Sequence, residues 1–163
     1  MENFRYYLAA ALLVILGGAG WWIYQGQQVV AKPGALFFPE DIQLVAKGQE
    51  LYGARCAACH GVNLEGAADW KTPGADGLLP APPHDETGHT WHHPDEMLFG
   101  ITKFGLAEFA NLENFKTNMP IYKNIMSDEE IIAVFSYIKS TWPPEIQAGH
   151  DELNRRNFEA KSQ

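Results

Sequence analysis

The stretch Cys56-Ala57-Ala58-Cys59-His60 decides the fold of this chain. It is a C-x-x-C-H motif, the pattern typical of covalent attachment of a c-type haem. Each thiol can add across a haem vinyl group, and the adjacent imidazole can then bind the iron. Cys56 and Cys59 are also the only two cysteines, so none remains for a disulfide. The motif predicts one covalently bound haem c, with His60 as the proximal iron ligand.

Two other chemistries use a C-x-x-C pair, and the rest of the sequence favours neither. A thioredoxin-like redox motif belongs in a βαβ pattern, which the chain lacks. A structural zinc site needs four ligands, and no second cysteine pair is present to complete one.

The composition limits the classes of partner. The 163 residues have room for one domain and additional segments, and the formal net charge is −8. That charge argues against nucleic-acid binding, which requires a basic patch. It suits docking to a protein with a positive face, although any soluble acidic surface would have the same charge.

Residues 6–24 read YYLAAALLVILGGAGWWIY and contain no charged side chain. At about 1.5 Å per residue the segment would span roughly 28 Å, close to the hydrocarbon thickness of a bilayer. Aromatic residues such as Trp21 and Trp22 gather at its ends, where they favour the membrane interface. We expect a transmembrane anchor at 6–24, preceded by a short cytoplasmic end at 1–5.

A cleaved signal peptide is the alternative reading of this segment. Its apolar region would be about 7–15 residues long and would be followed by an A-x-A-like site. The observed run is longer, and Gly18-Ala19-Gly20 is a weak cleavage site followed by two bulky tryptophans. The sequence therefore favours a retained anchor.

The remaining pattern predicts an all-α domain at residues 40–142, between a linker at 25–39 and a polar tail at 143–163. Pro33, Gly34 and Pro39 punctuate the linker, and the tail is expected to form one short surface helix. Helices are predicted at 39–55, 94–104 and 127–140, and a loop at 61–90. The third helix is the clearest, because Ser127 and Glu130 form an S-x-x-E capping box.

Met119, followed by Pro120, is the predicted distal iron ligand. A thioether is a soft ligand, and His/Met ligation raises the reduction potential and suits electron transfer. Met97 fits the commoner role of a core methionine, because it lies on a predicted helix. Met126 is the rival ligand, and a histidine ligand or an open sixth position remains a further alternative.

With these features the chain resembles class I cytochromes c over residues 41–142. Cys56, Cys59 and His60 match the haem-binding motif, and Met119-Pro120 matches the distal Met-Pro pair. The resemblance implies the class I cytochrome c fold, in which the glycine and aromatic of the first helix pack near an aromatic of the last. The matching residues are Gly48, Tyr52 and Tyr137.

The resemblance also implies that a proline carbonyl accepts a hydrogen bond from the proximal imidazole, a contact that orients the ring. Three prolines follow the motif at a suitable place, and the sequence alone does not choose among them. They are Pro80, Pro82 and Pro83.

Residues 83–93 depart from the family pattern, because they hold four of the six histidines. One hypothesis is a second metal site for copper or zinc, since both metals take imidazole and carboxylate ligands. The alternative is a loop at the haem edge, in which Trp91 and one or two histidines bond the haem propionates. The possible ligands are His84, His89, His92 and His93.

The expected function is single-electron transport between respiratory-chain components, without a catalytic residue or a small-molecule substrate. The donor would be a quinol-oxidising complex or a dehydrogenase, and the acceptor a terminal oxidase or another cytochrome. Bacterial c-type haem is attached outside the cytoplasmic membrane, so we expect the anchored domain to be periplasmic. One alternative is a fixed electron-relay subunit of such a complex. Another is a haem enzyme or gas sensor with an open sixth site, against which Met119 argues.

Overall fold

The computed structural model describes residues 32–163, which belong to the second of two compact units, Ala31–Gln163. The predicted anchor at 6–24 and the N-terminal end at 1–5 lie outside the described residues. Within residues 32–163, no helix is long and apolar enough to cross a bilayer.

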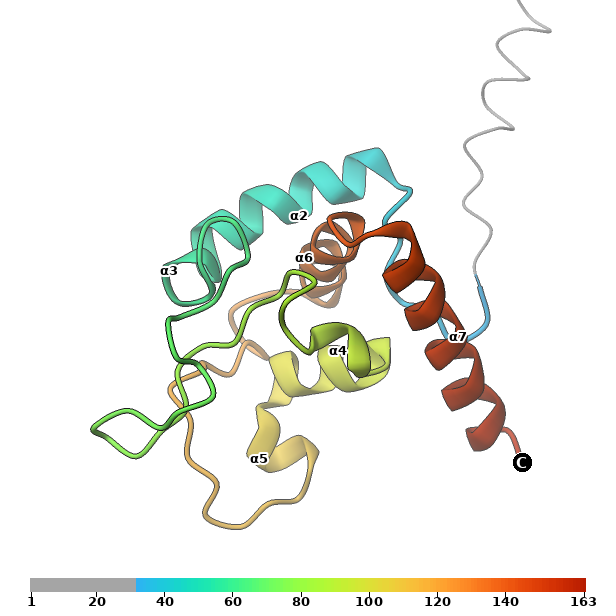
Figure 1. Cartoon of the computed structure of the whole chain (residues 1–163). Helices are drawn as coiled ribbons and strands as arrows, with labels where there is room; N and C mark the ends of the chain where they lie inside the picture. Colours follow the sequence, from blue (N-terminus) through green and yellow to red (C-terminus); the bar gives the residue numbers. More distant parts are fainter. Residues whose placement is uncertain (1–31) are drawn as a thin grey trace, which may run out of the picture. The chain divides into compact units, whose positions relative to one another are not determined.

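The described unit is built from helices and connecting loops and contains no strand, which confirms the all-α class for residues 32–163 (Figure 1). In chain order the elements are α2 (Ile42–Arg55), α3 (Ala57–His60), the short 3-10 helix η1 (Thr90–His92), α4 (Asp95–Phe104), α5 (Leu106–Phe109), α6 (Asp128–Ser140) and α7 (Pro144–Lys161).

The predicted helices form, with small shifts that their capping residues explain. Asp41 is the N-cap of α2 and accepts bonds from Gln43 N and Leu44 N at 3.0 Å, so the helix begins three residues later than predicted. The capping box of α6 is confirmed, because Ser127 and Glu130 bond each other's backbone amides.

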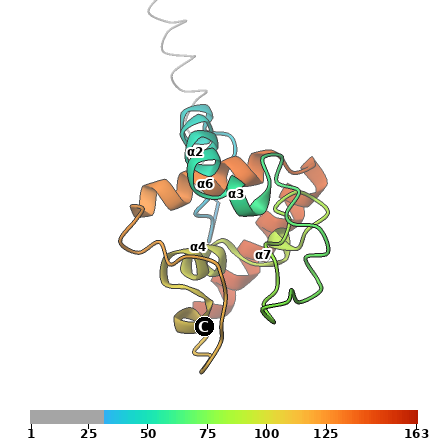
Figure 2. The ribbon, with the colours of Figure 1, turned by 90° about the vertical axis from the view of Figure 1, so that its left-hand side faces the viewer.

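Helices α2 and α6 cross at a glycine, as the resemblance implied. Figure 2 shows α2 nearly end-on, in front of α6 running across the view. Gly48 lies so close to α6 that an added Cβ would collide with the carbonyl group of Ala133 and lie 2.9 Å from Cβ of Tyr137. The ring of Tyr137 packs against that of Tyr52, with centroids 5.6 Å apart. The crossing therefore requires a residue without a side chain.

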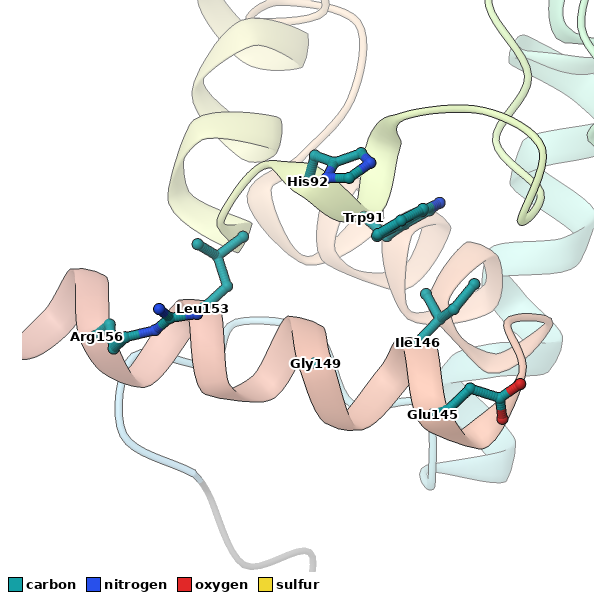
Figure 3. Close-up of a pocket in the computed structure, with 7 residues that line it drawn as sticks. All are labelled: Trp91, His92, Glu145, Ile146, Gly149, Leu153 and Arg156. Atoms are coloured by element: carbon teal, nitrogen blue, oxygen red, sulfur yellow. The ribbon is translucent and has the colours of Figure 1, made fainter.

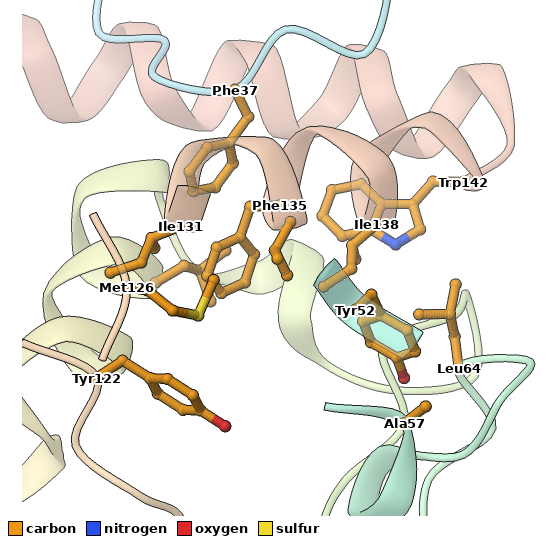
Figure 4. Packing of buried hydrophobic residues seen from close by; sticks show 12 residues of the cluster. Phe37, Tyr52, Ala57, Leu64, Tyr122, Met126, Ile131, Phe135, Ile138 and Trp142 are labelled. Atoms are coloured by element: carbon orange, nitrogen blue, oxygen red, sulfur yellow. The ribbon is translucent and has the colours of Figure 1, made fainter. Parts of the chain in front are cut away.

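The hydrophobic core lies between α2, α6 and the loops around them (Figure 4). Figure 4 shows Tyr52, Ala57, Leu64 and Trp142 gathered at one end of this core, beside the C-x-x-C-H turn. Burying these large side chains is the main favourable term in folding the domain.

The end of the predicted linker belongs to this core, which corrects the boundary placed at residue 39. Phe37 is 2% exposed and stacks on Phe135 with centroids 4.9 Å apart. The amides of Leu36 and Phe37 donate to Oδ2 of Asp95 at 2.7 and 3.0 Å. The predicted linker therefore includes a segment that is packed against the domain.

The predicted polar tail also differs from expectation, because α7 is 18 residues long and partly buried. His150 and Asn154, both 1% exposed, anchor it. Asp151 on the same helix bonds Nζ of Lys139 at 2.6 Å and Nζ of Lys32 at 2.7 Å. Helix α7 thus joins α6 to the segment that precedes α2.

Candidate haem site

The C-x-x-C-H motif forms one helical turn directly after α2. Cys56 ends α2 through a 2.9 Å bond from its amide to Tyr52 O, and its own carbonyl accepts the amide of His60 at 2.9 Å. Cys59 is exposed, whereas Cys56 is half-buried. Burial, and then the neighbouring Cys59, raise the pKa of the Cys56 thiol to about 11.

The imidazole of His60 is buried and oriented by one hydrogen bond. Its Nδ1 donates to the carbonyl of Pro82 at 2.8 Å, which selects Pro82 among the three prolines that the sequence left open. Burial lowers the pKa of His60, and the bond to Pro82 opposes that shift. In the neutral ring, Nδ1–H is occupied by Pro82 and the lone pair of Nε2 remains available to a metal.

Met119 and Met126 occupy different environments. Met119 is partly buried at the margin of the hydrophobic cluster, and its amide bonds Oγ1 of Thr117 at 3.1 Å. Met126 is 7% exposed and packs among core side chains (Figure 4). The packing of Met126 is that of a core residue, whereas Met119 lies at the margin of the core, so the geometry favours Met119 of the two as the predicted iron ligand.

A contact between two distant segments brings the methionine loop to the C-x-x-C-H turn. The hydroxyl of Tyr122, three residues after Met119, donates to the carbonyl of Arg55 at 2.9 Å. Arg55 directly precedes Cys56 in the chain. The proximal and distal segments are therefore joined at one side of the core.

An unpaired buried donor tests whether a haem fits here. Nε1 of Trp91 is buried and has no hydrogen-bond partner within residues 32–163. A propionate carboxylate would satisfy such an indole N–H, as the haem-edge interpretation of this loop requires. The available Nε2 of His60 and the two thiols of the same helical turn add the donors that a covalently bound haem requires, so the residues present fit a haem. Figure 3 shows the Trp91 ring on η1, opposite Ile146 of α7. Both residues line a groove of about 300 Å³.

The four clustered histidines make different contacts. His84 Nδ1 lies 2.8 Å from Oγ1 of Thr90, and His92 stacks on Trp91 with centroids 3.7 Å apart. His89 stacks on Trp70, and the His93 ring lies edge-on to that of His89.

In residues 32–163, no three His, Cys, Asp or Glu side chains are placed to hold a metal ion. The hypothesis of a second metal at His84, His89, His92 and His93 therefore lacks a ligand set. The rings of His84, His89 and His92 stack on His60, Trp70 and Trp91 respectively. This packing favours the interpretation of residues 83–93 as a loop at the haem edge.

Sequence reasoning missed some of the contacts around His60. The hydroxyl of Tyr52 donates to the carbonyl of Gly61 at 2.8 Å, which ties α2 to the end of the motif. The ring of His84 stacks on that of His60. Burial lowers the pKa of His84 well below its ordinary value, which favours the neutral form of the ring. The available signal was the position of His84 two residues after Pro82.

A model of the family described as cytochrome c matches residues 45–142, which is more than half of the chain. The match runs from α2 through α6 and includes the C-x-x-C-H turn and Met119. The chain therefore belongs to the cytochrome c family, as a class I c-type cytochrome. Members of this family bind haem covalently and are generally electron carriers. No curated protein and no solved structure shows significant similarity to the chain.

Proposed function

We propose that this protein is a membrane-anchored cytochrome with one haem c, which carries single electrons between respiratory-chain components on the periplasmic side of a bacterial cytoplasmic membrane. The observation that carries the haem assignment is the 2.8 Å bond from His60 Nδ1 to Pro82 O. It holds the imidazole of a C-x-x-C-H motif in the tautomer and orientation that an iron ligand needs.

Four side chains hold the haem in this proposal. Cys56 and Cys59 would form the two thioether bonds, His60 would be the proximal iron ligand and Met119 the distal one. The bound haem supplies a one-electron couple, and a methionine opposite a histidine raises its reduction potential. The chain positions the haem, excludes water and sets the potential, so no acid, base or nucleophile is required of it.

The proposed anchor is the apolar segment 6–24, and the proposed side of the membrane follows from where bacterial c-type haem is attached. The net charge of −8 supports partners with a positive docking face, such as a quinol-oxidising complex, a dehydrogenase, a terminal oxidase or another cytochrome.

A fixed relay subunit is the second candidate, and the packing of residues 32–38 favours it over a long-range shuttle. Phe37 is in the core, and Lys32 bonds both Glu40 and Asp151. Residues 25–31 connect the proposed anchor to this packed segment. Seven residues span at most about 25 Å when fully extended. Co-purification of the full chain with a larger complex in mild detergent would support the relay role.

The first experiment is an absorption spectrum of the reduced, haem-loaded full chain, with and without carbon monoxide. The wild type should resist carbon monoxide because Met119 closes the iron, and Met119→Ala should bind it. Met126→Ala is the matched control and should still resist the gas, because Met126 packs in the core. Ready binding by the wild type would instead favour a haem enzyme or sensor with an open sixth site.

A further inference from the structure

The ring of His84 lies flat against the ring of His60. Their centroids are 4.1 Å apart and their planes differ by 22°. Tyr52 lies edge-on to His84, with centroids 6.4 Å apart, and is itself 2% exposed. The proposed iron ligand is therefore packed against a second imidazole that a core residue supports.

Three hydrogen bonds hold His84 in this position. Its amide donates to the carbonyl of Leu64 at 2.7 Å, and its carbonyl accepts Nε1 of Trp142 at 2.8 Å. Its ring Nδ1 is bonded to Oγ1 of Thr90 at 2.8 Å, and Thr90 is 4% exposed. Both the backbone and the ring of His84 are thus tied to different parts of the domain.

The backbone at Leu64 is unusual in a way that serves this contact. Leu64 is 3% exposed and has a φ of 69°, in the left-handed region that non-glycine residues rarely adopt. Its carbonyl accepts the amides of both His84 and Asp85, at 2.7 and 3.3 Å. Backbone strain of this kind persists where the surrounding contacts enforce it, often near functional sites.

We propose that His84 is a positioning residue for the iron ligand: it sets the plane of the His60 imidazole and lowers the reduction potential of the haem. This inference rests on the proposed function, in which His60 binds the iron. The bond to Pro82 fixes the direction of one ring atom, whereas a flat ring packed over the face of His60 restricts rotation of the whole plane.

The effect on the potential follows from the polarity of an imidazole. Oxidised haem carries one more positive charge than reduced haem, and a polar neighbour stabilises that charge better than a hydrocarbon does. An aliphatic side chain at position 84 would fill similar space without this stabilisation. The polar ring of His84 therefore opposes the rise in potential that Met119 and burial produce.

The test uses the haem-loaded full chain and two substitutions that separate shape from polarity. His84→Leu removes both the flat ring and the polar atoms, and His84→Phe keeps a flat ring without polar atoms. The readouts are the g-values of the ferric haem by electron paramagnetic resonance, which report the ligand planes, and the midpoint potential by redox titration.

We expect His84→Leu to shift the g-values and raise the midpoint potential, and His84→Phe to raise the potential while keeping g-values near those of the wild type. Thr90→Val leaves the imidazole in place but removes its bond, and should broaden the ferric signal.

The inference is overturned if His84→Leu keeps both the g-values and the potential of the wild type. It is equally overturned if His84→Phe shifts the g-values as far as His84→Leu does. If His84→Leu does not fold, His84→Phe and Thr90→Val decide the question by the same two readouts. A wild type that lacks His/Met ligation in its own spectrum would contradict the proposed function instead, which separates the two failures.

Discussion

Asp95 and Asn154 exchange two hydrogen bonds between the start of α4 and the middle of α7. The amide of Asp95 donates to Oδ1 of Asn154, and the side-chain amide of Asn154 donates to Oδ1 of Asp95, both at 2.8 Å. The two residues are 0% and 1% exposed. Asn154 lies outside the residues that match the family. The buried polar pair therefore bonds α7, a helix beyond the matched residues, to the rest of the domain.

Asn154→Ala should destabilise the domain by roughly 2–3 kcal/mol, because it leaves buried groups of Asp95 without a partner. Denaturant unfolding followed by circular dichroism measures this change. Asn157→Ala is the control, since Asn157 lies on the same helix but is partly exposed. Equal unfolding free energies for the two variants would show that the buried pair contributes little.

Gly48→Ala should cost about 3 kcal/mol, at the upper end of the usual cost of overpacking, because the new methyl group meets the backbone of Ala133. Gly53→Ala, on the same helix, is the matched control. A Cβ at Gly53 has no atom within 4 Å, so this variant should gain roughly 0.5–1 kcal/mol from helix propensity. Thermal unfolding of both variants tests the opposite signs.

The ion pairs of Asp151 should make stability depend on pH on the acidic side. Burial alone would raise the pKa of Asp151, but the bonds from Lys139 and Lys32 outweigh it and hold the pKa below its ordinary value. A carboxylate with a lowered pKa contributes its full stability above the pKa of the unfolded chain, about 3.9. That contribution is lost as the pH falls through the folded pKa.

We therefore expect the unfolding free energy of the wild type to fall more steeply below about pH 4 than that of Asp151→Asn. Glu152→Gln is a control on the same helix, in an exposed ion pair with Arg155. Parallel acid limbs for the wild type and Asp151→Asn would contradict the role assigned to this ion pair.

The amides of Leu36 and Phe37 should exchange slowly with deuterium, although sequence patterning places them in a linker. Both donate to the buried carboxylate of Asp95. Protection should be comparable to that of core helical amides and should fall strongly in Asp95→Ala. Exchange of these two amides at the rate of an exposed loop in the wild type would show that the segment is not held.

Local chemistry made much of this protein predictable. The C-x-x-C-H turn is one short stretch, and the capping box of Ser127 with Glu130 spans a single helical turn. The requirement for glycine at position 48 was implied by family resemblance, and the crossing of α2 and α6 confirms it. The packed domain extends beyond the boundaries predicted at residues 39 and 143. The sequence did not show this, because the neighbouring polar and proline-rich stretches have no periodic apolar pattern of their own.

The sequence by itself predicted the kind of prosthetic group and its attachment, and it determined the helical class, because these depend on residue types at fixed short spacings. Only the tertiary structure chose Pro82 among three prolines, placed Phe37 and α7 in the domain, and laid His84 on His60. Each of those contacts joins segments far apart in the chain or depends on the path of a loop. The spacing of residues along the sequence does not show where a loop returns to the domain. Packing and hydrogen bonding between distant segments decide that.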